Sequence, residues 1–250
     1  MDVWAACREA VVPVPLSGEL VRMVENLSQT ATRALVDDLE EHALLEEMLD
    51  SSKPVMRPGT ESLHYLLATP FRYPPLAYGS RFGSRFEPSL FYAGLDMAPA
   101  LAETAYYRLV FLSGMTIAPP DGRLETAHTL FAAAYSSGQG LRLNQVPFDA
   151  YREVLTDPEH YRDTQLLGRQ MREAGIEMII YRSARDPEGG ENVALFEPGA
   201  LVGPAPLWKS AWLCDTREDG VTFYNKTEGT RAYHRSQFLV HGRLPFPPNQ

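Results

Sequence analysis

Residues 208–241 alternate apolar and polar side chains over three consecutive stretches, WKSAWLCDT, GVTFYN and TRAYHRSQFLV. Turn residues separate these stretches, at Glu218-Asp219-Gly220 and again at Glu228-Gly229. Because successive side chains of a strand point to opposite faces of a sheet, this alternation with short turns predicts antiparallel strands. The fold must therefore contain a sheet with an antiparallel C-terminal part.

Helices and further strands precede this region. Residues 97–111 are predicted to form a helix with Pro99 in its first turn, and residues 163–174 a helix that Gly175 ends. The stretches SLFYAG, IEMIIY and VALFEP are typical of buried strands, and residues 123–136 favour a strand followed by a turn. Short strands mixed with helices, without a regular βαβ alternation, predict the α+β class.

The N-terminal part has a different character. Apolar residues at helical spacing predict helices over residues 17–50, and we expect residues 1–60 to form an N-terminal helical extension of a domain over residues 61–250. Residues 1–60 hold eleven Asp and Glu against five Lys and Arg. This charge is either a solvated helix face or a surface for a basic partner.

The composition excludes several classes of protein. A hydrophobic share of 44% and a charged share of 22% are ordinary for a soluble globular chain, and the net charge of −9 argues against binding to nucleic acid or to anionic membranes. Cys7 and Cys214 lie far apart, which fits a reducing cytoplasm without a disulfide framework. We expect neither a membrane span nor a signal peptide, because the chain has no long apolar run and no basic leader.

The usual motifs of several enzyme classes are missing from the sequence. It contains no GxGxxG after a strand, no GxxxxGK[ST], no HExxH and no GxSxG. These absences argue against dinucleotide-binding Rossmann sites, P-loops and nucleophile-elbow hydrolases. The six histidines are scattered, so the sequence predicts no metal site.

The stretch YGSRFGSRFEPSLFYAG, residues 78–94, repeats Gly-Ser-Arg-Phe and so offers Arg81 and Arg85 on one loop. Arg72 precedes them between two aromatic residues. Each arginine either binds an anionic ligand or is solvated or stacked on an aromatic ring.

Four further polar residues lie beside predicted strands and helices: Tyr92, Glu103, Ser183 and Asn192. Each has an ordinary structural interpretation, as a core tyrosine, a surface acid and two turn residues. Together they also make chemical sense. Arginines bind a pyrophosphate, a tyrosine stacks on a planar ring, and a carboxylate beside a ribose stabilises an oxocarbenium-like transition state.

The ordered motifs GSRF (79–82), LFYAG (90–94), ALAE (100–103), IIYRSAR (179–185) and GGENVALFEP (189–198) resemble the RES domain family, over roughly residues 64–200. The stretches before GSRF resemble a longer subfamily with an N-terminal helical extension. Phe82 stands where the family usually has tryptophan. The resemblance implies an ADP-ribosyltransferase-like mixed sheet core with flanking helices, which binds NAD without a metal.

Residue roles follow from the resemblance by position. Glu103 would be the catalytic acid, with Arg81 and Ser183 beside it, and Ser183 would be a hydrogen-bonding group and not a nucleophile. The NAD-binding set would be Arg72, Arg81, Tyr92, Ser183 and Asn192. Arg81 precedes Tyr92 by eleven residues and Tyr92 precedes Glu103 by eleven, which is similar to the turn–strand–helix pattern of the family, so the resemblance favours Arg81 over Arg85 for the NAD site.

The resemblance also implies a cytoplasmic toxin of a toxin–antitoxin pair, with an Xre-type helix-turn-helix antitoxin as partner. We expect an NAD glycohydrolase that cleaves the nicotinamide–ribose bond. A mono-ADP-ribosyltransferase acting on a protein, and a module that binds NAD or a protein without turnover, remain alternatives because a fold does not establish an activity. The oligomeric state stays open, a homodimer included.

Overall fold

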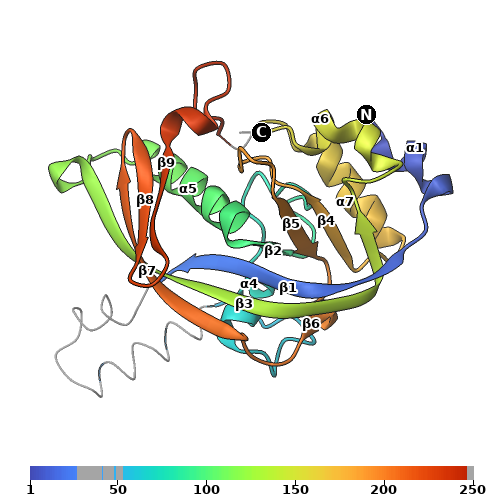
Figure 1. Ribbon diagram of the computed structural model, residues 1–250. Helices are drawn as coiled ribbons and strands as arrows, with labels where there is room; N and C mark the ends of the chain where they lie inside the picture. The colour runs from blue at the N-terminus through green and yellow to red at the C-terminus, as the bar shows by residue number, and fades with distance from the viewer. Residues whose placement is uncertain (27–40, 42–47, 49–52, 247–250) are drawn as a thin grey trace.

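The computed structural model describes residues 1–26, 41, 48 and 53–246, and these form a mixed sheet flanked by helices (Figure 1). The helices are α1 (Val3–Cys7), α4 (Tyr65–Arg72), α5 (Met97–Ser113), α6 (Arg152–Leu155) and α7 (Arg162–Glu173). The strands are β1 (Val14–Glu25), β2 (Phe91–Gly94), β3 (Arg123–Arg142), β4 (Met178–Arg182), β5 (Glu191–Leu195), β6 (Leu201–Val202), β7 (Trp208–Arg217), β8 (Gly220–Asn225) and β9 (Gly229–His234). The α+β class predicted from the sequence is confirmed.

The strand pairings close on themselves in one half of the sheet. The order β1-β2-β5-β4-β3 returns to its start, because β3 also pairs with β1 along most of the length of β1. Of the other four strands, the short β6 pairs with β3. Strands β7, β8 and β9 continue from the first half of β3 as an antiparallel layer, as the alternation in residues 208–241 predicts. The long strand β3 therefore joins the ring of five strands to the C-terminal layer.

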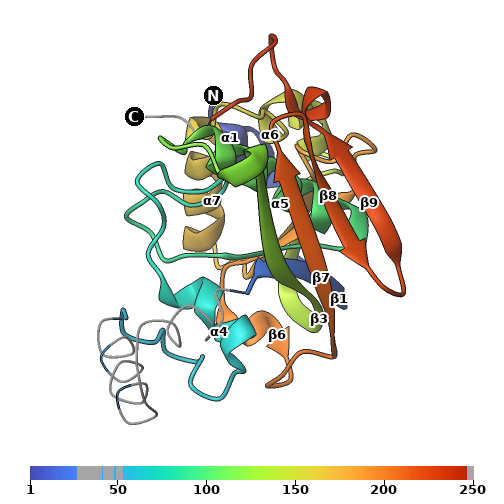
Figure 2. The same cartoon turned by 90° about the vertical axis from the view of Figure 1, so that its left-hand side faces the viewer.

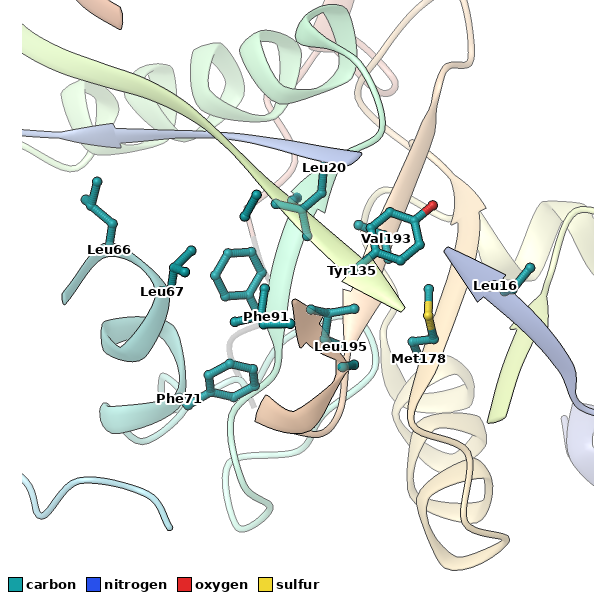
Figure 3. Packing of buried hydrophobic residues seen from close by; sticks show 14 of the residues in the cluster. Leu16, Leu20, Leu66, Leu67, Phe71, Phe91, Tyr135, Met178, Val193 and Leu195 are labelled. Carbon is teal, nitrogen blue, oxygen red and sulfur yellow. The ribbon is translucent and has the colours of Figure 1, made fainter. Parts of the chain in front are cut away.

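The interior of this ring is an apolar core (Figure 3). Leu20 of β1, Phe91 of β2, Leu195 of β5 and Tyr135 of β3 meet there, and Leu67 of α4 covers one end. All five side chains are at least nine-tenths buried. The inward side chains alternate with outward ones along each strand, as the period of a strand requires.

Helix α5 lies outside the ring and contacts β1, β2, β5, β7 and β8. In the perpendicular view, β7, β8 and β9 form one layer with α5 behind it (Figure 2). Gly94, which ends β2, allows the start of α5 to approach, since a Cβ atom there would lie 2.9 Å from the backbone nitrogen of Ala100. The helix is therefore held between the ring and the C-terminal layer, and its polar residues face the space between them.

One prediction is wrong. Residues 17–25, expected to be helical, belong to strand β1, which pairs with β3 and forms part of the same core as the rest of the chain. This strand is buried on both faces, with Leu20 inside the ring and Val21 and Met23 under α5, so its apolar residues lose the simple alternation that marks a strand. Residues 17–25 are thus not helical, whereas the rest of the helical prediction for residues 26–50 lies mainly outside the described residues. The division into an extension over residues 1–60 and a domain over residues 61–250 stays a prediction.

Candidate active site

A cavity of about 470 Å³ opens where β1, β2, α5 and the loop of residues 79–83 come together. Helix α5 contributes Glu103, Thr104, Tyr107, Arg108 and Phe111 to its wall. These residues recur at spacings of three and four, which places them on one face of the helix. A volume of this size is typical of sites that bind small molecules.

Glu103 lies at one end of the cavity, called here the Glu103 end. Its Oε1 accepts a hydrogen bond of 2.9 Å from Ser183 Oγ and one of 3.0 Å from Asn192 Nδ2. Ser183 follows β4 and Asn192 belongs to β5, so three separate elements meet at one carboxylate oxygen. Both donors act on the same oxygen, and Oε2 has no hydrogen-bond partner among the described residues.

Ser183 is buried and does not line the cavity. Its Oγ donates to Glu103 and accepts from the backbone N–H groups of Arg185 and Asp186, at 3.2 and 3.1 Å. A hydroxyl that has its hydrogen and its lone pairs engaged in this way is poorly suited to attack a substrate. Ser183 is therefore placed to orient the Glu103 carboxylate.

The first copy of Gly-Ser-Arg-Phe forms a tight turn. Ser80 N donates to Gly83 O at 2.7 Å, and Gly79 has a φ of 74°, a left-handed conformation that favours glycine. The hydroxyl of Tyr92 closes the turn, because it lies 2.8 Å from Ser80 Oγ and accepts from the backbone N–H of Phe82 at 3.1 Å. Tyr92 thus both lines the cavity and fixes the loop that carries Arg81.

Arg81 and Arg85, equivalent in the repeat, lie in different surroundings. Arg81 is buried, stacks over the Tyr161 ring at 4.8 Å, and donates to the carbonyl groups of Asp157 at 2.7 Å and Leu155 at 3.3 Å. It lines the cavity together with Tyr161. Arg85 is exposed and stacks on its neighbour Phe86 at 5.0 Å. Of the two arginines, Arg81 thus reaches the cavity wall, and its role in an NAD site stays a prediction.

Arg72 does not line the cavity. It ends helix α4, and its Nε donates to Pro54 O at 2.6 Å, so its assignment to the NAD site is not supported. Another arginine, Arg22 of β1, lies on the wall instead and donates to the carbonyl group of Tyr92. Arg22 was not among the predicted site residues because it falls in the segment that was expected to be helical.

Burial shifts the ionisation of two groups at the Glu103 end. It lowers the pKa of Arg22 to about 10, which leaves the guanidinium charged at neutral pH. Burial also raises the pKa of Tyr92 to about 12, so its hydroxyl keeps its proton. The wall of the cavity thus presents a cation and a neutral phenol near the carboxylate.

Arg185 is a second residue that sequence reasoning missed. Its guanidinium stacks on Tyr106 at 3.6 Å and donates to Pro158 O at 2.7 Å and to the Tyr161 hydroxyl at 3.2 Å. Arg81 and Arg185 therefore hold residues 155–161 from two sides. The stretch IIYRSAR contained the signal, because the arginine stands two residues after Ser183.

Two kinds of feature are absent from the part of the chain that the structure describes. The described residues contain no group of three His, Cys, Asp or Glu side chains that could hold a metal ion. None of the helices in the described ranges has the length and apolar character needed to cross a membrane.

Comparisons with known proteins identify the family. The model of the RES domain matches residues 54–216, well over half of the chain, so this protein belongs to the RES domain family. Among solved structures, the chain is similar to one in the "Crystal structure of the M.tuberculosis MbcT-MbcA toxin-antitoxin complex", with 9% identity, a TM-score of 0.45, and coverage of 82% of this chain and 87% of that one. No curated protein sequence matches the chain.

Proposed function

We propose that this protein hydrolyses NAD at the bond between nicotinamide and ribose. The observation that most supports this proposal is the position of the Glu103 carboxylate, which Ser183 and Asn192 orient at the cavity wall. Arg22 and Arg81 line the same cavity. A fixed carboxylate with two cations nearby suits a substrate that joins a ribose to a pyrophosphate. The RES family resemblance points to the same substrate.

The reaction converts NAD and water into ADP-ribose, nicotinamide and a proton. The C1′–N bond breaks, its electron pair goes to the nicotinamide ring, and the ribose passes through an oxocarbenium-like state. Glu103 stabilises this positive charge through Oε2 or holds a ribose hydroxyl. Water then adds to C1′ and releases its proton.

The remaining wall residues bind and orient in this proposal. Arg22 and Arg81 contact the pyrophosphate, and the ring of Tyr92 lies against the nicotinamide. Asn192 and Ser183 keep the carboxylate in place, since each gives its hydrogen bond to Oε1. Metal chemistry is not required for any of these roles.

Family membership further supports a role as the toxin of a toxin–antitoxin pair in the cytoplasm. An Xre-type helix-turn-helix antitoxin is the expected partner, because such proteins accompany RES toxins. A gene for a small helix-turn-helix protein beside this one, together with relief of growth inhibition when both are expressed, tests the pairing. Growth inhibition that persists in the presence of that neighbour contradicts it.

Quantifying free nicotinamide by chromatography tests the chemistry. Purified protein incubated with NAD should release nicotinamide and ADP-ribose in equal amounts. Release that requires cell lysate, with ADP-ribose attached to protein, shows a mono-ADP-ribosyltransferase instead. If no nicotinamide forms with or without lysate, the protein is a binding module and the enzymatic proposal fails.

A further inference from the structure

Tyr181 lies on the cavity wall, and the proposed reaction gives it no role. It belongs to the motif IIYRSAR and to β4, and its side chain is buried. In the antiparallel pair of β4 and β5 it stands directly opposite Asn192, and directly opposite residues point their side chains to the same face of a sheet. Asn192 Nδ2 donates to Glu103 Oε1 at 3.0 Å. Tyr181 therefore projects from the face of the sheet over which the Glu103 carboxylate lies.

The ring of Tyr181 also contacts the turn that carries Arg81. Its centroid lies 4.8 Å from that of the Phe82 ring, with an interplanar angle of 74°, which is an edge-to-face contact. Phe82 is fully buried and follows Arg81 directly in the sequence. Tyr181 thus lies between the hydrogen bond of Asn192 to Glu103 on one side and the Arg81 turn on the other.

The hydroxyl of Tyr181 is available to a ligand. It has no hydrogen-bond partner among the described residues, and unlike the unpartnered atoms Arg22 Nε and Asn192 Oδ1 it keeps accessible surface. Because the rest of the side chain is buried and Tyr181 lines the cavity, this hydroxyl opens to the cavity. The Tyr92 hydroxyl differs, since Ser80 and the backbone N–H of Phe82 already engage it.

The charges nearby decide what Tyr181 can bind. Burial and the neighbouring Glu103 charge raise the pKa of the Tyr181 hydroxyl well above its ordinary value, so it keeps its proton at neutral pH. A neutral phenol donates one hydrogen bond and accepts others. The Glu103 carboxylate disfavours a phosphate at this place, because like charges repel. The hydroxyl therefore suits an uncharged polar group such as an alcohol.

We propose that the Tyr181 hydroxyl binds a hydroxyl group of the ribose that NAD carries next to nicotinamide. This inference rests on the proposed function, in which that ribose lies at Glu103 and the pyrophosphate at Arg81. The part of NAD between these two points is the ribose itself, which carries secondary alcohols at C2′ and C3′. Tyr181 is thus a substrate-binding residue that fixes the rotation of the ribose against the Glu103 carboxylate.

Calorimetric titration of ADP-ribose into the full-length protein tests this inference. ADP-ribose keeps this ribose and the pyrophosphate but has no nicotinamide to lose. Tyr181→Phe should bind it about three- to tenfold more weakly than the wild type, as expected for one lost neutral hydrogen bond. Tyr151→Phe is the matched control and should bind like the wild type, because Tyr151 packs against the same apolar cluster but does not line the cavity.

Two deoxy analogues of ADP-ribose, without the C2 or the C3 hydroxyl of this ribose, identify the contact. For the analogue that lacks the contacted hydroxyl, Tyr181→Phe and the wild type should have affinities within about twofold of each other, because the interaction is already gone. For the other analogue the variant should still bind more weakly. The two analogues thus show which alcohol Tyr181 holds.

Melting curves separate ligand binding from folding. Tyr181→Phe should melt within about 2 °C of the wild type, since no hydrogen bond within the protein is lost. Tyr92→Phe should melt at a lower temperature, because its hydroxyl closes the turn around Arg81.

Three results overturn the inference: no binding of ADP-ribose at millimolar concentration, equal affinity of Tyr181→Phe and the wild type, or the same loss for ADP-ribose and both deoxy analogues. None of these measurements requires bond cleavage. Nicotinamide release without an effect of Tyr181→Phe on binding therefore refutes the ribose contact alone. The predicted binding differences without nicotinamide release refute the proposed hydrolysis alone.

Discussion

Arg81 and Arg85 occupy equivalent places in the Gly-Ser-Arg-Phe repeat, yet their replacement by alanine should have very different effects. Arg81→Ala removes the 2.7 and 3.3 Å hydrogen bonds to two carbonyl groups and the stacking on Tyr161. Each hydrogen bond contributes about 1 kcal/mol and the cation–π contact up to about 1 kcal/mol, so the free energy of unfolding should fall by roughly 2–3 kcal/mol. Arg85 is exposed, so Arg85→Ala should change the free energy of unfolding by less than about 0.5 kcal/mol.

Catalysis should separate the two arginines further. If Arg81 holds the pyrophosphate, Arg81→Ala should lower kcat/KM for NAD by at least about tenfold, and Arg81→Lys should recover only part of this loss because a lysine lacks the planar guanidinium. Denaturant unfolding and steady-state nicotinamide release measure the two effects. Equal losses of stability and activity in Arg81→Ala and Arg85→Ala would refute the assignment.

Three further changes probe the supports of the site. Ser183→Ala leaves two backbone N–H groups without their acceptor and Glu103 with one donor fewer, so chemical denaturation should show a loss of about 1–3 kcal/mol and kcat/KM should fall about tenfold. Gly168→Ala would put a Cβ atom 1.9 Å from Phe82 O, so overpacking should lower the free energy of unfolding by about 1–3 kcal/mol and lower the melting temperature. An unchanged melting curve would contradict this packing. Burial lowers the pKa of His128 below 6.5, so the unfolded chain binds a proton more readily than the folded one. The free energy of unfolding should therefore decrease as the pH is lowered from about 7.5 to about 5.5, and it should decrease less steeply in His128→Gln.

The sequence predicted the elements that are bounded by clear turns or caps. The strands before Ser183 and around Asn192 are continuous apolar runs between polar turns, and the C-terminal hairpins alternate apolar and polar residues between turns. The helix that carries Glu103 has Pro99 in its first turn and Gly114 at its end. Strand β1 was misread because its apolar residues Leu20, Val21 and Val24 recur at spacings that mimic a helix, and no turn separates the strand from the apolar residues at helical spacing that follow it in the sequence. Arg22 and Glu25 were lost with it.

In the candidate site, too, some residues could be predicted from local motifs and others could not. Glu103, Ser183 and Asn192 could be grouped from the ordered motifs, and the structure brings their side chains into hydrogen-bonding contact. The ion pair of Arg108 with Glu25 on the cavity wall could not be foreseen, because it joins residues more than eighty positions apart through the packing of α5 on β1. Long-range pairing of this kind leaves no local signal in the sequence.

Nicotinamide release by Glu103→Gln, compared with the wild type and with Glu188→Gln, tests the central claim most directly. Glu188 is an exposed glutamate between β4 and β5 and serves as the matched control. Glutamine keeps the size of the side chain and the hydrogen bonds to Oε1, so the fold should remain while the release rate falls by about 10²- to 10³-fold. A Glu103→Gln protein that melts like the wild type and still releases nicotinamide at the wild-type rate would contradict the account.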